Sequence, residues 1–101
     1  MPQYRAPVKD TLFVLNEVIG LDRYANLPGF ANATPDMVEA VLTEAGRFCS
    51  EVLAPLNLVG DREGCTRHAD GSVTTPTGCK AAYDAFVEAG WPLLTAPEEF
   101  G

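Results

Sequence analysis

Residues 34–56, TPDMVEAVLTEAGRFCSEVLAPL, decide the fold of this 101-residue chain. Thr34 suits a helix N-cap, and Pro35 takes the first helical position, where its missing N–H costs nothing. The apolar side chains that follow share an arc of about 140° when each residue turns the helix by 100°. They are Val38, Val41, Leu42, Ala45, Phe48, Cys49, Val52, Leu53 and Leu56, with Glu39, Thr43, Glu44, Arg47 and Glu51 on the other side. The stretch predicts an amphipathic helix that Pro55 ends or kinks.

The sequence before this helix predicts an extended arm, a short helix and a loop. Two prolines favour an extended backbone over residues 1–9. Asp10 is the predicted N-cap of a helix that ends near Gly20. Apolar residues surround this helix rather than forming one stripe: Leu12, Phe13, Val14, Leu15, Val18 and Ile19. Such a helix needs cover on several sides, and residues 21–33 then read as a connecting loop.

The second half of the chain predicts a loop, a small hairpin and a third helix. Residues 57–64 are loop-like, and Asp70-Gly71 suits the turn of a hairpin between residues 66–68 and 73–74. Thr75-Pro76 repeats the cap-and-proline start, and Gly90 is the predicted stop after Ala89. The predicted buried face is Cys79, Ala82, Tyr83, Phe86 and Val87, with Lys80, Asp84 and Glu88 in solvent and residues 91–101 as an extended tail. The predicted fold class is therefore mainly α, with three helices and one small β-hairpin.

Composition excludes several classes of function. Fourteen acidic residues against seven basic ones give a net charge of −7, which disfavours binding to nucleic acid and to anionic membranes. No signal peptide and no segment of transmembrane length can be read, so a cytoplasmic location is expected. Cys49, Cys65 and Cys79 show no C-x-x-C spacing, and His68 is the only histidine. These residues lack the usual zinc ligand set, and reduced thiols are expected.

The remaining polar and aromatic residues predict no site. His68 is interpreted as an exposed hairpin residue rather than a general base. Glu98 and Glu99 are neighbours in a predicted extended segment and would point to opposite sides. No phosphate-binding pattern is formed by the glycines at positions 60, 64, 71 and 78. Trp91 is expected to pack on the preceding helix. For Tyr4, on the extended arm, contact with the surface of a partner is left as an open alternative. No catalytic, cofactor-binding or metal-ligating residue is predicted.

Five segments in order resemble the beginning of an acyl-CoA dehydrogenase. They are Tyr4-x-x-Pro7-x-x-Asp10-x-x-Phe13-x-Leu15, Glu51-Val-Leu-Ala-Pro55 with Gly60-Asp61-x-x-Gly64, Asp70-Gly71-x-Val73-x-Thr75-Pro76-x-Gly78, Ala89-Gly90-Trp91-x-x-Leu94, and Pro97-Glu98-Glu99-Phe100-Gly101. They are similar to the larger subfamily that includes the methylmercaptopropionyl-CoA dehydrogenases, whose members begin with an extra segment. Cys79 departs from the aromatic residue expected after Gly78.

The resemblance implies a division into an N-terminal extension, 1–33, and the start of the helical domain, 34–101. It implies a FAD-dependent enzyme of fatty acid metabolism that dehydrogenates an acyl-CoA thioester, passes electrons to electron-transfer flavoprotein and forms a homo-oligomer. Family members continue beyond the Pro-Glu-x-x-Gly-Gly motif, and the flavin site and catalytic base lie in those later parts. The chain alone is therefore expected to be inactive and, with its uncovered apolar residues, to self-associate. The alternative is a free-standing helical protein-interaction module.

Overall fold

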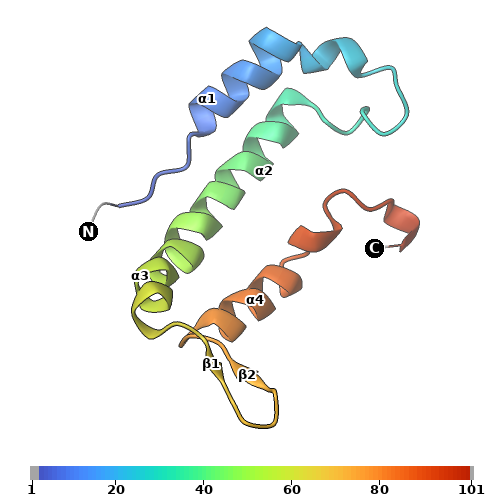
Figure 1. Cartoon of the computed structure of the whole chain (residues 1–101). Helices are drawn as coiled ribbons and strands as arrows, with labels where there is room; N and C mark the ends of the chain where they lie inside the picture. Colours follow the sequence, from blue (N-terminus) through green and yellow to red (C-terminus); the bar gives the residue numbers. More distant parts are fainter. Residues whose placement is uncertain (1–2, 101) are drawn as a thin grey trace. The chain divides into compact units, whose positions relative to one another are not determined.

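The computed structural model describes residues 3–100, and the chain divides into two compact units, Met1–Ala54 and Pro55–Gly101. Most of the described residues are helical, in three continuous helical stretches over 8–19, 35–63 and 79–88 (Figure 1). A single two-stranded antiparallel hairpin lies between the second and third stretches in the chain. The predicted fold class, mainly α with three helices and one small hairpin, is confirmed.

The first helical stretch begins earlier than predicted. Helix α1, Val8–Phe13, follows Pro7 and continues as the π-helical turn η1, Val14–Ile19. Asp10 is not its N-cap; the Thr11 hydroxyl instead donates a hydrogen bond to the Pro7 carbonyl at 2.9 Å. The extended arm is accordingly shorter than expected, because proline suits the position before a first turn. The predicted stop at Gly20 is confirmed by its left-handed backbone, with φ 68°.

The predicted loop after Gly20 contains one short helical turn. The 3-10 helix η2, Leu21–Tyr24, begins directly at the left-handed glycine. The Arg23 guanidinium donates hydrogen bonds back to the Ile19 and Gly20 carbonyls, at 2.5 and 3.4 Å. The side chain thereby adds a donor to the end of η1, where the Gly20 carbonyl also accepts from the Arg23 N–H at 2.9 Å.

Helix α2, Pro35–Phe48, starts as the sequence predicts. The Met37 N–H donates to the Thr34 hydroxyl oxygen at 3.3 Å, and Pro35 lies in the first turn. The polar residues assigned to its outer side are exposed, and the apolar set is half-buried except for Leu53, which is exposed. Among the described residues only Gly46 and Ala82 are fully buried. The amphipathic face is therefore correctly assigned, but it is only partly covered.

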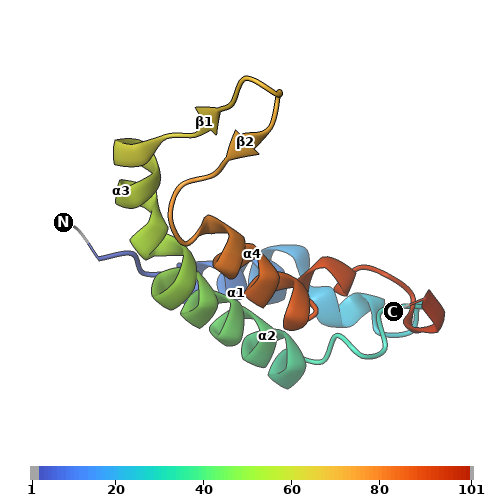
Figure 2. The same ribbon diagram turned by 90° about the horizontal axis from the view of Figure 1, so that it is seen from below.

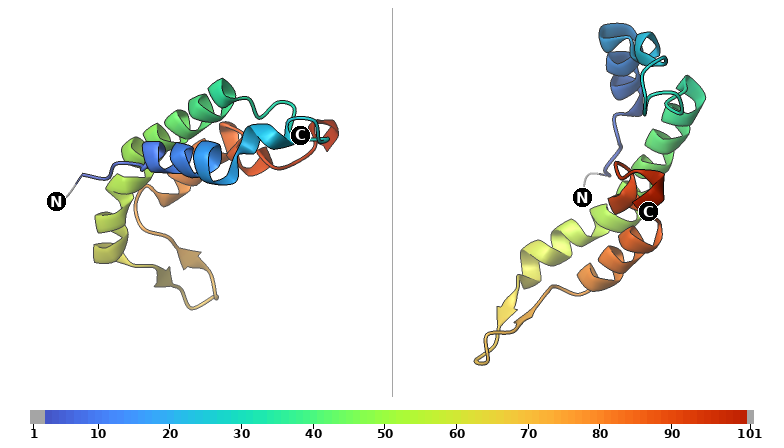
Figure 3. Two further views of the ribbon diagram at one scale, coloured as in Figure 1. Left: turned by 90° about the horizontal axis from the view of Figure 1, so that it is seen from above. Right: turned by 90° about the vertical axis from the view of Figure 1, so that its right-hand side faces the viewer.

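Pro55 does not end the helical backbone. The π-helix η3, Cys49–Leu53, leads into α3, Ala54–Glu63, so the loop predicted over 57–64 is wrong. The Ala54 N–H donates to the carbonyl of Cys49, five residues earlier. A proline ring in a regular α-helix clashes with the carbonyl four residues before it, here that of Glu51. The wider π turn shifts that carbonyl and lets the helical backbone pass the proline, a path that can be followed in Figure 3.

At Gly46 the N-terminal arm closely approaches the backbone of α2. Gly46 is buried, and α1 packs against α2 beside it. A Cβ atom added at Gly46 would lie 2.9 Å from the Ala6 Cβ and 3.6 Å from the Val8 Cγ2. Real Cβ atoms do not approach so closely, so only glycine permits this contact between helix and arm.

This contact predicts strong coupling between positions 6 and 46. Gly46→Ala should gain about 1 kcal/mol of helix propensity but lose about 1–3 kcal/mol by overpacking against Ala6. In an Ala6→Gly background the same substitution should be stabilising, because the obstructing methyl group is absent. Urea unfolding of the four proteins measures the coupling energy, which should exceed about 1 kcal/mol. Additive free energies of unfolding would show that the arm does not pack on Gly46.

The hairpin of the second unit forms as predicted. Strand β1, Thr66–Arg67, pairs with β2, Val73–Thr74, so that Thr66 faces Thr74 and Arg67 faces Val73 (Figure 2). The Gly71 N–H donates to the His68 carbonyl at 3.0 Å, and the His68 N–H donates to the Ser72 carbonyl at 2.8 Å. Gly71 has φ 88°, the left-handed conformation that closes a three-residue hairpin loop.

Helix α4, Cys79–Glu88, begins later than the Thr75-Pro76 pair predicted. Gly78 precedes it with φ 88°, so a regular helix cannot start at Pro76 and run through this residue. The buried face is also narrower than predicted. Ala82 is buried, and Cys79 and Phe86 are half-buried. Tyr83 follows Ala82 and Val87 follows Phe86, so both lie further around the helix. Both are exposed, Tyr83 to 64%. The predicted stop at Gly90 is confirmed by φ 84°.

The tail is turned rather than extended. Trp91–Leu93 and Glu98–Phe100 form the 3-10 turns η4 and η5. Pro92 and Pro97 account for the difference, because each fixes φ at a value that a helical turn accepts. Trp91 is half-buried, and η4 packs against α4.

Candidate functional site

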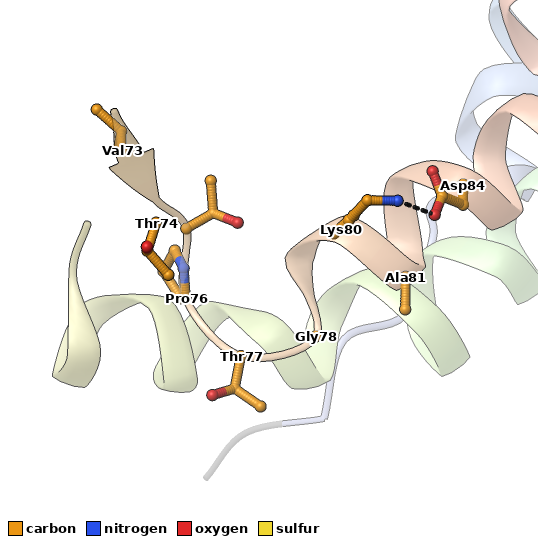
Figure 4. Close-up of a pocket in the computed structure, with 9 residues that line it drawn as sticks. Val73, Thr74, Pro76, Thr77, Gly78, Lys80, Ala81 and Asp84 are labelled. Atoms are coloured by element: carbon orange, nitrogen blue, oxygen red, sulfur yellow. Dashed lines mark hydrogen bonds and ion pairs between the residues drawn. The ribbon is translucent and has the colours of Figure 1, made fainter. Parts of the chain in front are cut away.

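An open hollow of about 700 Å³ lies in the second unit. It is lined by β2, by the connection 75–78 and by the first two turns of α4 (Figure 4). Ligand sites are concave and hold a few polar groups that converge on the ligand. The hollow is therefore the place where a binding function must first be tested.

A carboxylate from α3 holds one wall of this hollow. The Thr77 N–H and the Thr77 hydroxyl both donate to the Glu63 Oε2 atom, at 2.8 and 3.0 Å. Beside them, a Cβ added at Gly78 would lie 2.9 Å from the Leu56 Cδ2. The connection is thus fixed against α3 by a charge-assisted pair of hydrogen bonds and by a close apolar contact. Sequence analysis missed this pairing, which joins residues fourteen positions apart.

The Glu63 contact predicts a local effect on backbone exchange. Glu63→Ala should remove the acceptor of the Thr77 amide and speed its hydrogen exchange at least tenfold, because the connection then opens more easily. Glu88→Ala, at an exposed position of the same unit, is the matched control and should leave this amide unchanged. Residue-resolved exchange by NMR measures both. Equal Thr77 exchange in the wild type and in Glu63→Ala would contradict the role of Glu63.

The charged pair on the hollow neutralises itself. The Lys80 ammonium donates to the Asp84 carboxylate at 2.7 Å, and both side chains are exposed, as predicted. The hydrogen bond and the charge of Asp84 raise the pKa of Lys80. The ammonium group is thus kept charged and is paired with a carboxylate that also lines the hollow, as the dashed line in Figure 4 shows. A hollow with this internal pair offers little net charge to a phosphate group.

His68 lies in the hairpin, as expected, and is exposed. Its Nε2 atom lies 2.6 Å from the Thr74 hydroxyl oxygen. The contact stabilises the pair of strands from the side, as cross-strand polar pairs do. The interpretation of His68 as an exposed hairpin residue is confirmed.

Asp70 organises the turn that follows His68. Its Oδ1 atom accepts hydrogen bonds from the Ser72 N–H at 2.9 Å and from the Ser72 hydroxyl at 2.7 Å. Both bonds favour the ionised carboxylate, and the hydroxyl bond is the larger cause, so the pKa of Asp70 is lowered. The turn therefore gains stability above the unfolded-state pKa of about 4 and loses it as the pH falls through the lower folded-state value.

Ser72→Ala should accordingly raise the pKa of Asp70 toward its ordinary value. The substitution removes the hydroxyl donor and keeps the backbone N–H, so part of the shift should remain. NMR titration of the Asp70 side-chain carbon measures the change, with Ser50→Ala as a control outside the hairpin. An unchanged titration midpoint would show that the hydroxyl does not hold the carboxylate.

A second charged cluster lies on the exposed side of α2 and η3. The Arg47 guanidinium donates two hydrogen bonds to the Glu44 carboxylate and one to Glu51 at 2.7 Å. The bond from Arg47 lowers the pKa of Glu44, and the two carboxylates raise the pKa of Arg47. All three side chains are more than half exposed, and pairs of this kind at helical spacing add little to stability. The cluster is a solvated helix surface.

The other sequence candidates do not converge on a site. Glu98 and Glu99 lie together in the turn η5 and are exposed, and Tyr4 is also exposed. The three cysteines carry free thiols. Within residues 3–100 no three or more His, Cys, Asp or Glu side chains are grouped to hold a metal ion. In the same part of the chain, no helix has both the length and the apolar character needed to cross a membrane.

The geometry of the hollow does not indicate a class of protein, but comparison with known proteins does. No protein-family model matches the chain. The chain is similar to acyl-CoA dehydrogenases over nearly all its length, and the sequence-based recognition of that class is confirmed. It is 41% identical over 98 residues to the 3-methylmercaptopropionyl-CoA dehydrogenase of Ruegeria pomeroyi, covering 97% of the chain. It is 30% identical over 102 aligned positions to the broad-specificity linear acyl-CoA dehydrogenase FadE5 of Mycobacterium tuberculosis. The chain spans 16% and 17% of the lengths of these relatives.

Proposed function

We propose that the chain is a segment of a FAD-dependent acyl-CoA dehydrogenase, which oxidises an acyl-CoA thioester to its α,β-unsaturated form. The observation that carries the proposal is the 41% identity to a 3-methylmercaptopropionyl-CoA dehydrogenase across 97% of the chain. In this role residues 1–33 are an N-terminal extension and residues 34–101 begin the helical domain. The proposed whole protein is cytoplasmic and homo-oligomeric, and it passes electrons to electron-transfer flavoprotein.

The residues described here do not fit the flavin. The hollow beside α4 has its cation paired with Asp84, and the backbone of its rim is held by Glu63 rather than left open to a phosphate. A pyrophosphate site needs converging backbone N–H groups or unpaired cations. No catalytic step is therefore assigned to a residue of this chain.

The contribution of this segment is proposed to be architectural. Its long helical stretch and the α4 helix each present a partly covered apolar face. Such faces are suited to completing a helical domain that walls an acyl pocket, because apolar helix faces are stable only when another surface covers them. The acyl specificity would then be set by residues outside this segment.

A free-standing interaction module is the second candidate. The exposed apolar residues of α1 and η1 favour it, because an uncovered helix face can bind a partner. The two candidates differ in the length of the encoded protein. An open reading frame that continues into a flavin-binding region supports the dehydrogenase, whereas a stop codon after Gly101 supports the module.

The proposal predicts that the purified chain of residues 1–101 binds no FAD and oxidises no acyl-CoA. Equilibrium dialysis against FAD measures binding, and reduction of a dye acceptor measures oxidation of straight-chain and methylmercaptopropionyl thioesters. The product of the full reading frame is the control and should be active in both assays. A flavin-loaded preparation of the 101-residue chain would overturn the assignment of the flavin site to other parts of the protein.

A further inference from the structure

The same helix-start signal stands before α2 and before α4, but only α2 uses it. The Thr34-Pro35 pair opens α2, and the threonine hydroxyl accepts a hydrogen bond from the Met37 N–H at 3.3 Å. Thr75-Pro76 repeats the pair before α4. There the helix begins three residues after the proline, at Cys79, and the residue before it, Gly78, provides no side-chain cap. A cap that the sequence offers is therefore left unused.

Glu63 holds the connection before α4 in a form that excludes this cap. Its Oε2 atom accepts from the Thr77 N–H and from the Thr77 hydroxyl, at 2.8 and 3.0 Å, and so binds Thr77 to α3. Gly78 follows with φ 88°, a left-handed conformation that interrupts a helix. Because glycine adopts right-handed and left-handed backbone about equally readily, Gly78 can enter a helix without a steric penalty once Thr77 is released.

We propose that the connection 75–78 is a two-state helix start and that Glu63 holds it in the short form. In the long form Thr75 caps the helix and α4 begins at Pro76, in the way that α2 begins. The connection lines the hollow beside α4, so a change between the two forms reshapes the hollow (Figure 4). The two-state start does not depend on the proposed dehydrogenase function and holds or fails separately from it.

The two forms differ in the partners of two backbone N–H groups. In an α-helix that begins at Pro76, the Lys80 N–H donates to the Pro76 carbonyl, and the Ala81 N–H donates to the Thr77 carbonyl. In the short form the Cys79 N–H donates to the Pro76 carbonyl instead, at 3.2 Å. The Lys80 and Ala81 amides then belong to the first turn of α4, whose N–H groups have no partner within the helix. Their hydrogen exchange therefore distinguishes the two forms.

Residue-resolved exchange of Glu63→Ala, followed by NMR, tests the switch. The Lys80 and Ala81 amides should exchange at least threefold more slowly than in the wild type, because they gain helical partners, while the Thr77 amide exchanges faster. Glu63→Gln keeps an acceptor without the charge and should show the same slowing with a smaller amplitude, so it decides the question if Glu63→Ala loses its fold. Glu88→Ala is the matched control and should leave the Lys80 and Ala81 amides unchanged.

Two additions to Glu63→Ala separate the cap from the glycine. Gly78→Ala favours the long form, because alanine disfavours a φ of 88° and its Cβ would lie 2.9 Å from the Leu56 Cδ2 in the short form. The double variant should therefore slow the exchange of Lys80 and Ala81 at least tenfold. Adding Thr75→Val keeps the shape of the side chain but removes the cap hydroxyl, and it should reverse most of this slowing.

The sign of the change in exchange decides the outcome. If the loss of Glu63 only lets the connection fray, the Lys80 and Ala81 amides exchange as fast as in the wild type or faster, and the proposal is wrong. The proposal also fails if slow exchange of these two amides survives Thr75→Val, because the long form then has no cap at Thr75.

Discussion

Helix α2 is the surface on which the first unit is built, and Gly46 sets how closely the N-terminal arm approaches it. The arm at Ala6 and the first turn at Val8 both lie against the bare backbone of Gly46. The path of the arm fixes where α1 starts and which of its faces turns toward α2. The half-buried positions of Leu12 and Leu15, and the exposure of the residues opposite them, follow from that single contact.

Local rules predicted the parts of the fold that are decided by one or two residues. The Thr34 hydroxyl caps α2, and Gly20, Gly71 and Gly90 each adopt the left-handed backbone where a helix or hairpin must turn. In each case the chemistry that fixes the backbone belongs to the residue itself. Such elements do not depend on what packs against them, and the sequence is sufficient to find them.

Two elements were mispredicted where one local signal competed with another. The sequence predicts that Pro55 ends or kinks the helix and that a loop follows, but the π turn before Pro55 accommodates the ring, and α3 follows without a break. Thr75-Pro76 has the form of a helix start, yet the donors of Thr77 are bound by Glu63, and Gly78 turns the chain before α4 begins. Both outcomes depend on contacts or helix variants that residue periodicity does not encode. The Glu63–Thr77 pair had no sequence signal, because the two residues belong to different elements, and periodicity describes the faces of one element rather than contacts between two.

The sequence shows no pattern of catalytic or ligand-binding residues from which the hollow beside α4 could be predicted. The arrangement of the charged side chains in the structure explains why. Several charged side chains of the described residues are engaged locally: Lys80 with Asp84, Arg47 with Glu44 and Glu51, and Glu63 with Thr77 in the connection before α4. These pairings fix local backbone and helix surfaces, and the one that lines the hollow, Lys80 with Asp84, carries no net charge. The apolar side chains show the opposite behaviour, since even large ones such as Phe13 and Tyr83 are mostly exposed. Large apolar side chains that stay exposed on a helix are stabilised when another protein surface covers them, which fits the architectural role proposed for this segment.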